Sequence, residues 1–219
     1  MRKQTLDGQK AHHSSVKSIL NEIVRSNVPM SFNHSHIVVA LHLLSQMPPL
    51  GRYRLSKELA LSGTTARTLL KRLQKHNYVS TISKGALHRG HTLTEKGSAL
   101  SLKVKERANI FPEPLNLGPL TVGEIDAIVH VSAQWARTDF NPIEARDSAV
   151  SMGAKGCTVI NFGKKGLEVG DKLLSDDLVH KLLLNNLKPG DLIHVGTADG
   201  FEIARLGAVA ASLCSWKEE

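Results

Sequence analysis

The sequence has few aromatic residues, few cysteines and no long apolar run. Phe, Trp and Tyr make up 4% of the chain, which disfavours a protein that binds single strands by stacking bases on aromatic side chains. The two cysteines, Cys157 and Cys214, are too few for a disulfide framework and lack metal-ligand spacing. No apolar run approaches the roughly 18 residues of a membrane span, and no secretory signal is apparent. We therefore expect a cytoplasmic protein without membrane contact.

Charge is divided unequally between the two halves of the chain. Residues 1–110 hold 18 Lys and Arg against 5 Asp and Glu, a net charge of +13. Residues 111–219 hold 10 against 15, a net charge of −5, which leaves the total of +8. The first half is therefore suited to a polyanionic partner and the second is not. The alternative is a basic surface that only faces solvent.

The region from Leu55 to Gly97 has the order of a DNA-binding device. Its segments are a helix over 55–61, a Ser62-Gly63 turn, a basic helix over 64–75, a strand over 78–83, a basic loop over 84–91 and a return over 92–97. Two helices joined by a tight turn and followed by a basic hairpin are typical of a winged helix-turn-helix. Such a turn orients the second helix so that it can enter a major groove.

The second of these helices separates into an apolar and a polar face. Ala66, Leu69, Leu70 and Leu73 recur at helical spacing and should face the core. We expect the polar face to bind double-stranded DNA, with base contacts near its N-terminal end and phosphate contacts further along. The candidate residues on this helix are Thr64, Thr65, Arg67, Thr68, Lys71, Arg72 and Lys75.

The loop of the expected hairpin is basic. Lys84, His88 and Arg89 could follow the backbone or enter a minor groove, and an exposed basic turn is the alternative. The pairs His34/His36 and His88/His91 raise the question of a metal. Neither has a cysteine nearby or a carboxylate at ligand spacing, so we expect no metal and no cofactor.

The remaining periodicities predict an α+β or α/β chain of two domains. Residues 1–110 would form a winged helix-turn-helix domain that includes an amphipathic helix over 11–27, which either packs on its own domain or forms a homodimer seam. Residues 111–120, rich in proline, would be a linker. Strands alternate with helices over 121–219, which predicts a small mixed α/β sandwich, partly parallel and partly antiparallel.

Two loops of the second half are candidates for binding a small-molecule effector. One follows a predicted strand, and the other lies between a strand and the last helix. Clefts at strand ends commonly hold ligands. The candidate residues are Gln134, Trp135, Arg137, Arg146, Thr197 and Asp199. For the second loop, a helix cap made by Thr197 or Asp199 is the favoured alternative.

Residues 36–107 resemble the winged helix-turn-helix transcription regulators of the MarR, PadR and TrmB-like kind. The resemblance rests on Leu55–Leu59, Thr64–Leu73, Asn77–Val79 and Leu93–Gly97. Position 77, often Gly in that domain, is Asn here, and both residues tolerate a left-handed backbone. The whole chain, through 143–156, resembles an archaeal-type family that joins such a domain to an uncharacterised α/β domain. That resemblance implies regulation and carries over no catalytic residue.

These observations predict a sequence-specific, ligand-responsive transcription regulator that binds duplex DNA, as a homodimer, and is not an enzyme. Two alternatives stay open. An enzyme domain could be tethered to DNA by the first half, which a clustered acid/base pair in a deep cleft would favour. A non-specific architectural or replication-linked binder would instead protect random DNA uniformly.

Overall fold

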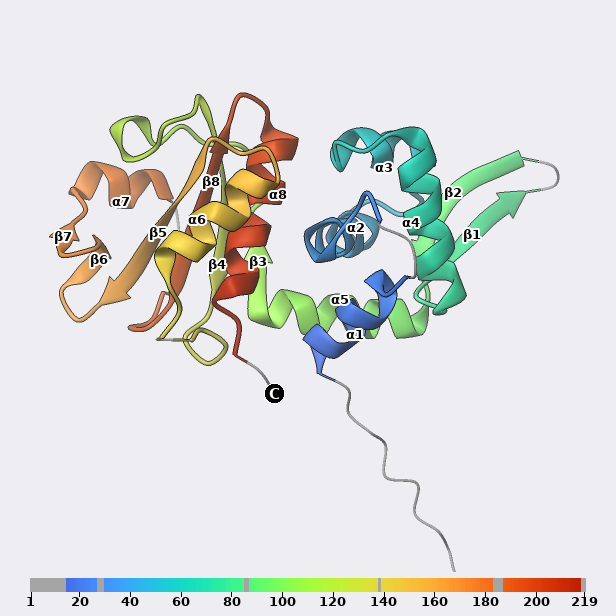
Figure 1. Ribbon diagram of the computed structural model, residues 1–219, viewed down its shortest axis with the longest axis horizontal. Helices are drawn as coiled ribbons and strands as arrows, with labels where there is room; N and C mark the ends of the chain where they lie inside the picture. Colours follow the sequence, from blue (N-terminus) through green and yellow to red (C-terminus); the bar gives the residue numbers. More distant parts are fainter. Residues whose placement is uncertain (1–14, 27–29, 85–86, 138, 183–186, 218–219) are drawn as a thin grey trace, which may run out of the picture.

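The protein consists of two lobes set side by side, as Figure 1 shows for the computed structural model. The structure describes residues 15–26, 30–84, 87–137, 139–182 and 187–217. Both lobes combine helices with an antiparallel sheet, of two strands in the first lobe and six in the second. No helix within those ranges is long and apolar enough to cross a membrane.

The N-terminal lobe is mainly helical. Its elements are α1 (Val16–Val24), α2 (His34–Gln46), α3 (Arg52–Glu58), α4 (Gly63–Lys75), β1 (Val79–Lys84), β2 (Leu87–Leu93) and α5 (Glu95–Arg107). Short polar side chains begin these helices: the oxygens of Ser15, Ser62 and Thr94 accept first-turn N–H groups of α1, α4 and α5. Helix α2 is capped by Asn33, whose side-chain oxygen accepts from the N–H of Ser35 and His36.

The predicted apolar face of α4 is confirmed, since Ala66, Leu69, Leu70 and Leu73 are all buried. After α4 the chain turns through Asn77, whose φ of 60° is the left-handed conformation expected at this position. Gly97 in the first turn of α5 lies directly against the backbone carbonyl of Tyr78, and a Cβ there would overlap that oxygen. The helix pair and the hairpin are thereby packed closely on one another.

A dimer seam formed by the amphipathic first helix is not available. Val16, Leu20 and Ile23 are each no more than 1% exposed within the single chain, where they join the core of their own lobe. Figure 1 shows α1 beside α5. The apolar face of α1 is therefore buried inside the single chain, and a dimer would need another surface.

The C-terminal lobe is a sheet with helices. Its elements are β3 (Ala108–Ile110), the 3₁₀ turn η1 (Gly118–Leu120), β4 (Ile125–Val131), α6 (Pro142–Ser151), β5 (Gly156–Gly163), β6 (Gly166–Val169), β7 (Lys172–Leu173), α7 (Asp176–Leu182), β8 (Leu192–Ala198) and α8 (Phe201–Cys214). The strand order is β3-β4-β8-β5-β6-β7, and every pairing is antiparallel. The expected parallel component is thus wrong, because β8 inserts between β4 and β5 and runs opposite to both.

Helix α8 lies on one face of this sheet and reaches both lobes. Gly196 of β8 touches the backbone of α8 at Ala204 and Ala208, so the strand and the helix meet without a side chain between them. On its other side α8 packs against α2. Buried residues of both lobes form one continuous core as a result. The opposite face of the sheet packs on a separate cluster that includes Leu117 and Leu182.

The segment expected as a linker is attached to the sheet. Strand β3 pairs with β4 directly after α5, so the chain enters the second lobe at Ala108. The N–H of Leu115 donates to Asp126 O, and the N–H of Leu117 donates to Asp126 Oδ2 at 2.7 Å. The prolines at 112, 114 and 119 lie beyond both α5 and β3, and residues 111–120, expected to be a linker, follow the sheet edge.

Candidate functional site

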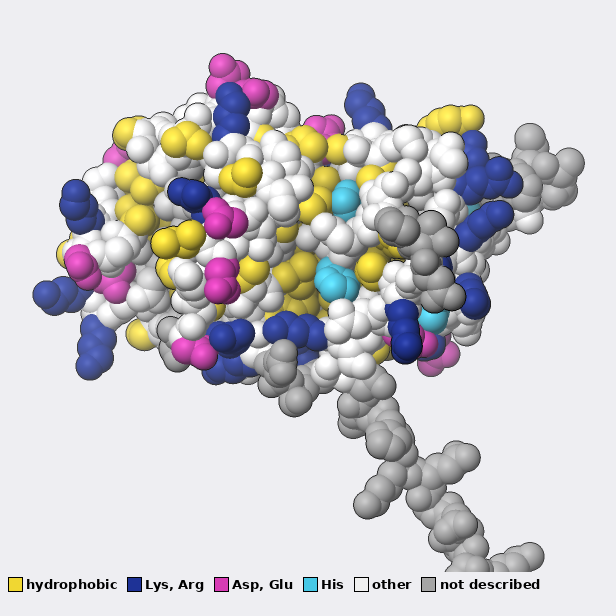
Figure 2. All heavy atoms as spheres, in the orientation of Figure 1, with side chains coloured by type: hydrophobic (Ala, Val, Ile, Leu, Met, Phe, Trp, Pro, Cys, Tyr) yellow, Lys and Arg dark blue, Asp and Glu magenta, His cyan; other side chains and the backbone are white. Residues whose placement is uncertain are grey.

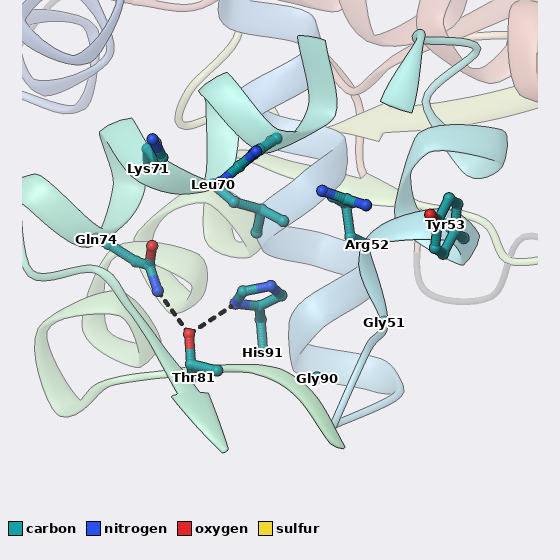
Figure 3. Close-up of a pocket in the computed structure, with 10 residues that line it drawn as sticks. Gly51, Arg52, Tyr53, Leu70, Lys71, Gln74, Thr81, Gly90 and His91 are labelled. Atoms are coloured by element: carbon teal, nitrogen blue, oxygen red, sulfur yellow. Dashed lines mark hydrogen bonds between the residues drawn. The ribbon is translucent and has the colours of Figure 1, made fainter. Parts of the chain in front are cut away.

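A groove of about 530 Å³ lies between α3, α4 and the β1–β2 hairpin. Figure 3 shows side chains from all three elements facing it. It is lined by Gly51, Arg52, Tyr53, Arg67, Leu70, Lys71, Gln74, Thr81, Gly90 and His91. Three of these side chains are cationic and none is acidic. In Figure 1 this region lies at the end of the first lobe that faces away from the second lobe.

The exposed face of α4 supplies the cations of this groove. Arg67 and Lys71, one helical turn apart, are exposed and line it, and Lys75 is exposed one turn further along. None of the three has a hydrogen bond or ion pair with another described residue. Figure 2 shows dark blue Lys and Arg side chains gathered at this end of the molecule. Their charges are therefore available to a partner in solution.

A chain of polar contacts fixes the hairpin against α4. Gln74 Nε2 donates to Thr81 Oγ1 at 2.7 Å, and that oxygen lies 3.3 Å from His91 Nδ1 (Figure 3). His91 also exchanges two backbone hydrogen bonds of 2.9 Å with Leu50, just before α3. Gly90 has a φ of 135° and touches Leu50, so only glycine fits there. These contacts tie all three walls of the groove together.

The start of α3 adds two residues that the sequence analysis missed. The expected helix began at Leu55, whereas α3 begins at Arg52 after the N-cap Gly51. Tyr53 is 76% exposed, and the guanidinium carbon of Arg52 lies 4.9 Å from the centre of its ring. The sequence signal for these residues is the run Arg52-Tyr53-Arg54 directly after Gly51. It was overlooked because helical spacing of apolar residues starts only at Leu55.

The other predicted residues of α4 differ in their local roles. Thr64 and Thr68 are exposed, and the Thr68 hydroxyl donates to the Thr64 carbonyl at 3.2 Å. Thr65 is half-buried and its Oγ1 lies 2.9 Å from Ser62 Oγ at the helix cap. Arg72 Nη1 donates to the carbonyl of Arg25, the C-cap of α1, at 2.9 Å. Arg72 thus makes one contact inside its own lobe, and its phosphate contact stays a prediction.

The predicted residues of the hairpin loop are placed only in part. The backbones of Lys84, His88 and Arg89 belong to β1 and β2, whose register shifts between Ile82 and Ser83. Their side chains lie outside the described part of the structure, as do residues 85–86.

The predicted effector residues do not form one site. Gln134, Trp135 and Arg137 follow β4 at the end of the sheet where β8 begins, whereas Thr197 and Asp199 lie at the opposite end of β8. In an antiparallel sheet, successive strands end on opposite edges. The two candidate loops therefore lie at opposite edges of the sheet, and effector binding by either loop stays a prediction.

Five of these six side chains have a local partner. Trp135 lies under the guanidinium of Arg107, at 3.9 Å, and not beside Arg137, which pairs with Asp139. Arg146 pairs with Asp147 and Asp199 with Lys155. The buried Thr197 Oγ1 accepts the N–H of Gly123, and the N-cap of α8 is Gly200, without a side-chain cap. Neither Thr197 nor Asp199 caps the helix, because the strand continues through Ala198.

The histidines of the first lobe have separate surroundings. Burial lowers the pKa of His34, and it lowers the pKa of His36 and His42 to about 4. For His42 the charges of Arg205 and Lys105 act in the same direction. Among the described residues, no three His, Cys, Asp or Glu side chains gather where a metal ion could be held.

Comparison with known proteins matches the two lobes separately. Residues 33–99 match the family described as PH0730-like, N-terminal domain, and residues 122–215 match a domain of unknown function, DUF4443. The chain is similar to the solved structure of the hypothetical protein PH0730 from Pyrococcus horikoshii OT3, with 21% identity and a TM-score of 0.66. The match covers 84% of this chain and 93% of that one. No curated protein matches.

These matches support an archaeal-type arrangement of two domains. They cover most of each lobe and, in the solved structure, the two lobes together. At this level of identity the likeness concerns the fold. The chemistry of the groove must therefore be argued from its own residues.

Proposed function

We propose that this protein is a DNA-binding regulator whose first lobe is a winged helix-turn-helix that docks α4 into the major groove of a duplex. The observation that carries the proposal is the exposed cationic row of Arg67, Lys71 and Lys75 on a helix whose other face is fully buried. A row of cations on a rigid helix complements the negative charge of the DNA backbone.

The dimensions of α4 support this docking. Thirteen residues make a helix about 20 Å long, and a helix with side chains is about 10–12 Å across, close to the width of the major groove. Thr64, Arg67 and Thr68 occupy the N-terminal half, which enters the groove in helix-turn-helix proteins. Arg67 would form two hydrogen bonds with a guanine, and the threonine methyl groups would meet thymine methyls.

The walls of the groove supply backbone contacts on either side of the bases. Arg52 and Tyr53, at the start of α3, offer a cation and a phenol hydroxyl, which bind phosphate oxygens. The hairpin on the other side acts as the wing. Its position relative to α4 is fixed by Gln74 and Thr81, so the wing and the recognition helix would meet DNA as one rigid surface.

Sequence-specific binding is favoured over non-specific binding by the composition of this face. Hydroxyl and guanidinium groups gather at the end of α4 that would reach the bases, whereas Lys71 and Lys75 are further along. A purely architectural protein needs only the backbone cations. Regulation of transcription is the role that specific binding of this kind serves.

Selection of duplexes from a random library by the purified chain tests the proposal. We expect enrichment of a short common sequence, and protection of that sequence in footprints on fragments of the source genome. Uniform protection of random DNA would instead indicate a non-specific architectural DNA-binding protein. Absence of duplex binding even at low ionic strength would reject DNA binding altogether.

A further inference from the structure

A cleft of about 420 Å³ lies between the two lobes, away from the groove described above. It is lined by Met30, Ser31, Phe32, Asn33, His36, Ala60, Leu61, Ser151, Met152, Ile203 and Leu206. These residues come from the start of α2, the turn between α3 and α4, the end of α6 and the outer face of α8. Figure 2 shows hydrophobic and histidine side chains at the surface between the lobes. The volume and the position between lobes are those of many small-molecule sites.

His36 brings an unused hydrogen-bonding atom to this cleft. It is only 8% exposed, and its Nδ1 lies 3.2 Å from the backbone nitrogen of Asn33 and 2.9 Å from Asn33 Oδ1. Its Nε2 has no partner among the described residues. Burial lowers the pKa of His36 to about 4, so the ring is neutral at pH 7. A neutral ring whose Nδ1 is occupied has its Nε2 left for a ligand.

Asn33 contributes a second polar group, the amide of an exposed side chain. Its side-chain Nδ2 contacts Met152 Sδ of the other lobe at 3.0 Å. A thioether is a weak acceptor, and an oxygen atom would be a better partner for this amide. Asn33 and His36 are one helical turn apart, so a single small molecule could reach both.

The remaining lining excludes ions. None of the residues that line the cleft is an acid, a lysine or an arginine, and its half-buried apolar side chains include Leu61, Met152 and Ile203. The nearby Arg205 is directed at Glu58 instead, with its Nη2 at 3.0 Å from Glu58 Oε2. A charged ligand would lose hydration here without gaining an opposite charge. Methionines provide adaptable apolar contacts for an uncharged one.

We propose that this cleft binds an uncharged, amphipathic small molecule, which hydrogen-bonds to Asn33 and His36 and covers the apolar side chains of both lobes. The site differs from the loops of the second lobe that the sequence suggested. Its occupation would affect DNA binding through the wall formed by Ala60 and Leu61, and that consequence rests on the proposed function. Ala60 has a φ of 49° in the turn that sets the angle between α3 and α4.

Titration with prodan, a neutral ketone dye with an apolar naphthalene body, tests the site directly. We expect saturable binding of one dye per chain, with a blue-shifted emission. Ser151→Trp fills the mouth of the cleft and should weaken dye binding at least tenfold. Ser45→Trp is the matched control: both serines are exposed near a helix end, and both hydroxyls donate to the carbonyl three residues earlier at 2.7 Å.

The control variant should bind the dye within twofold of the wild-type chain, and equal melting temperatures of the two variants would show that both fold. Dye binding that is not saturable, or that Ser151→Trp leaves unchanged, overturns the proposal. His36→Phe, which keeps an aromatic ring at this position, should lower the affinity for the dye at least threefold. An unchanged affinity would show that His36 does not contact the dye.

A second arm separates this site from the proposed function. Saturating dye should change the affinity of the wild-type chain for its selected duplex by at least fivefold, and should leave Ser151→Trp unaffected. Dye binding without that change would support the site and reject its regulatory consequence. Failure of the chain to bind any duplex would reject the proposed function, and the dye titration would still decide the site.

Discussion

The guanidinium of Arg205 in α8 joins the second lobe to the last residue of α3. Its Nη2 donates to the Glu58 carbonyl at 2.7 Å and to Glu58 Oε2 at 3.0 Å. Arg205 is 4% exposed, whereas the Glu58 side chain is 25% exposed. Among the described residues, the Nε of Arg205 has no hydrogen-bond partner. One buried cation thus holds the end of α3 against the other lobe, and the two partners of this ion pair differ in their exposure to water.

This difference predicts unequal effects of removing either partner. Glu58→Ala leaves a buried guanidinium without its countercharge and should lower the free energy of unfolding by about 3 kcal/mol. Arg205→Met leaves a carboxylate that can turn to water and should cost about 1 kcal/mol. Urea unfolding monitored by circular dichroism measures both. Arg54→Met, which removes an exposed pair of 4.0 Å with Glu58, is the control, at under about 0.5 kcal/mol. Equal costs for the first two variants would contradict this reading of the pair.

Arg67→Ala should weaken binding to the selected duplex by about 1–3 kcal/mol and relax the preference at one base pair. The reason is the loss of a bidentate contact that only one base satisfies. Fluorescence anisotropy with the selected duplex and its single-base variants measures both effects. Lys172→Ala, an exposed cation on β7 of the other lobe, should change neither. Unaltered affinity and preference in Arg67→Ala would exclude Arg67 as a base-reading residue.

Lys71→Gln should reduce the salt dependence of DNA binding by about one unit of log affinity per log salt concentration. A lysine on a phosphate releases about one counterion, independent of sequence. Arg72→Gln provides the contrast, because Arg72 is bonded to the Arg25 carbonyl. Arg72→Gln should lower the free energy of unfolding and leave the dependence of log affinity on log salt concentration unchanged. A slope that falls with Arg72→Gln and not with Lys71→Gln would reverse the assignment of these two residues.

Acid should destabilise the protein through His194. Burial lowers its pKa from 6.5 to about 3, and its Nε2 lies 2.9 Å from Ser215 Oγ. The unfolded chain therefore takes up the proton first, and the stabilisation present above about pH 6.5 is lost as the pH falls towards 3. Between pH 7 and pH 5 this group should remove about 2 kcal/mol. Urea unfolding at both pH values measures this loss. The unfolding free energy of the wild-type chain should fall by this amount more than that of His194→Asn, and an equal fall in both chains would refute the prediction.

Gly97→Ala should destabilise the first lobe by about 1–3 kcal/mol, because the new Cβ overlaps the Tyr78 carbonyl and must push α5 away from the hairpin. Gly63→Ala is a matched substitution at the start of α4, where nothing lies within 4 Å of the new atom. It should be neutral or stabilise slightly. Thermal unfolding compares the two, and similar melting temperatures would show that α5 adjusts freely.

Local residue patterns specify much of the structure of the first lobe. The spacing of Ala66, Leu69, Leu70 and Leu73 specified the buried face of α4 and, with it, the exposure of Arg67 and Lys71. Asn77 likewise tolerates the left-handed turn that the chain makes there. These features depend on residues within one or two helical turns of each other, so a single chain carries their whole signal.

Only the tertiary structure decided which distant segments meet. The insertion of β8 between β4 and β5 made the sheet antiparallel and separated Trp135 from Thr197. The contact of Arg72 with α1, the burial of Leu20 in its own lobe, and the cleft at His36 likewise join residues far apart in the chain. Periodicity reports which face of an element is apolar and carries no information about the element that covers it. That choice depends on the packing of the complete chain.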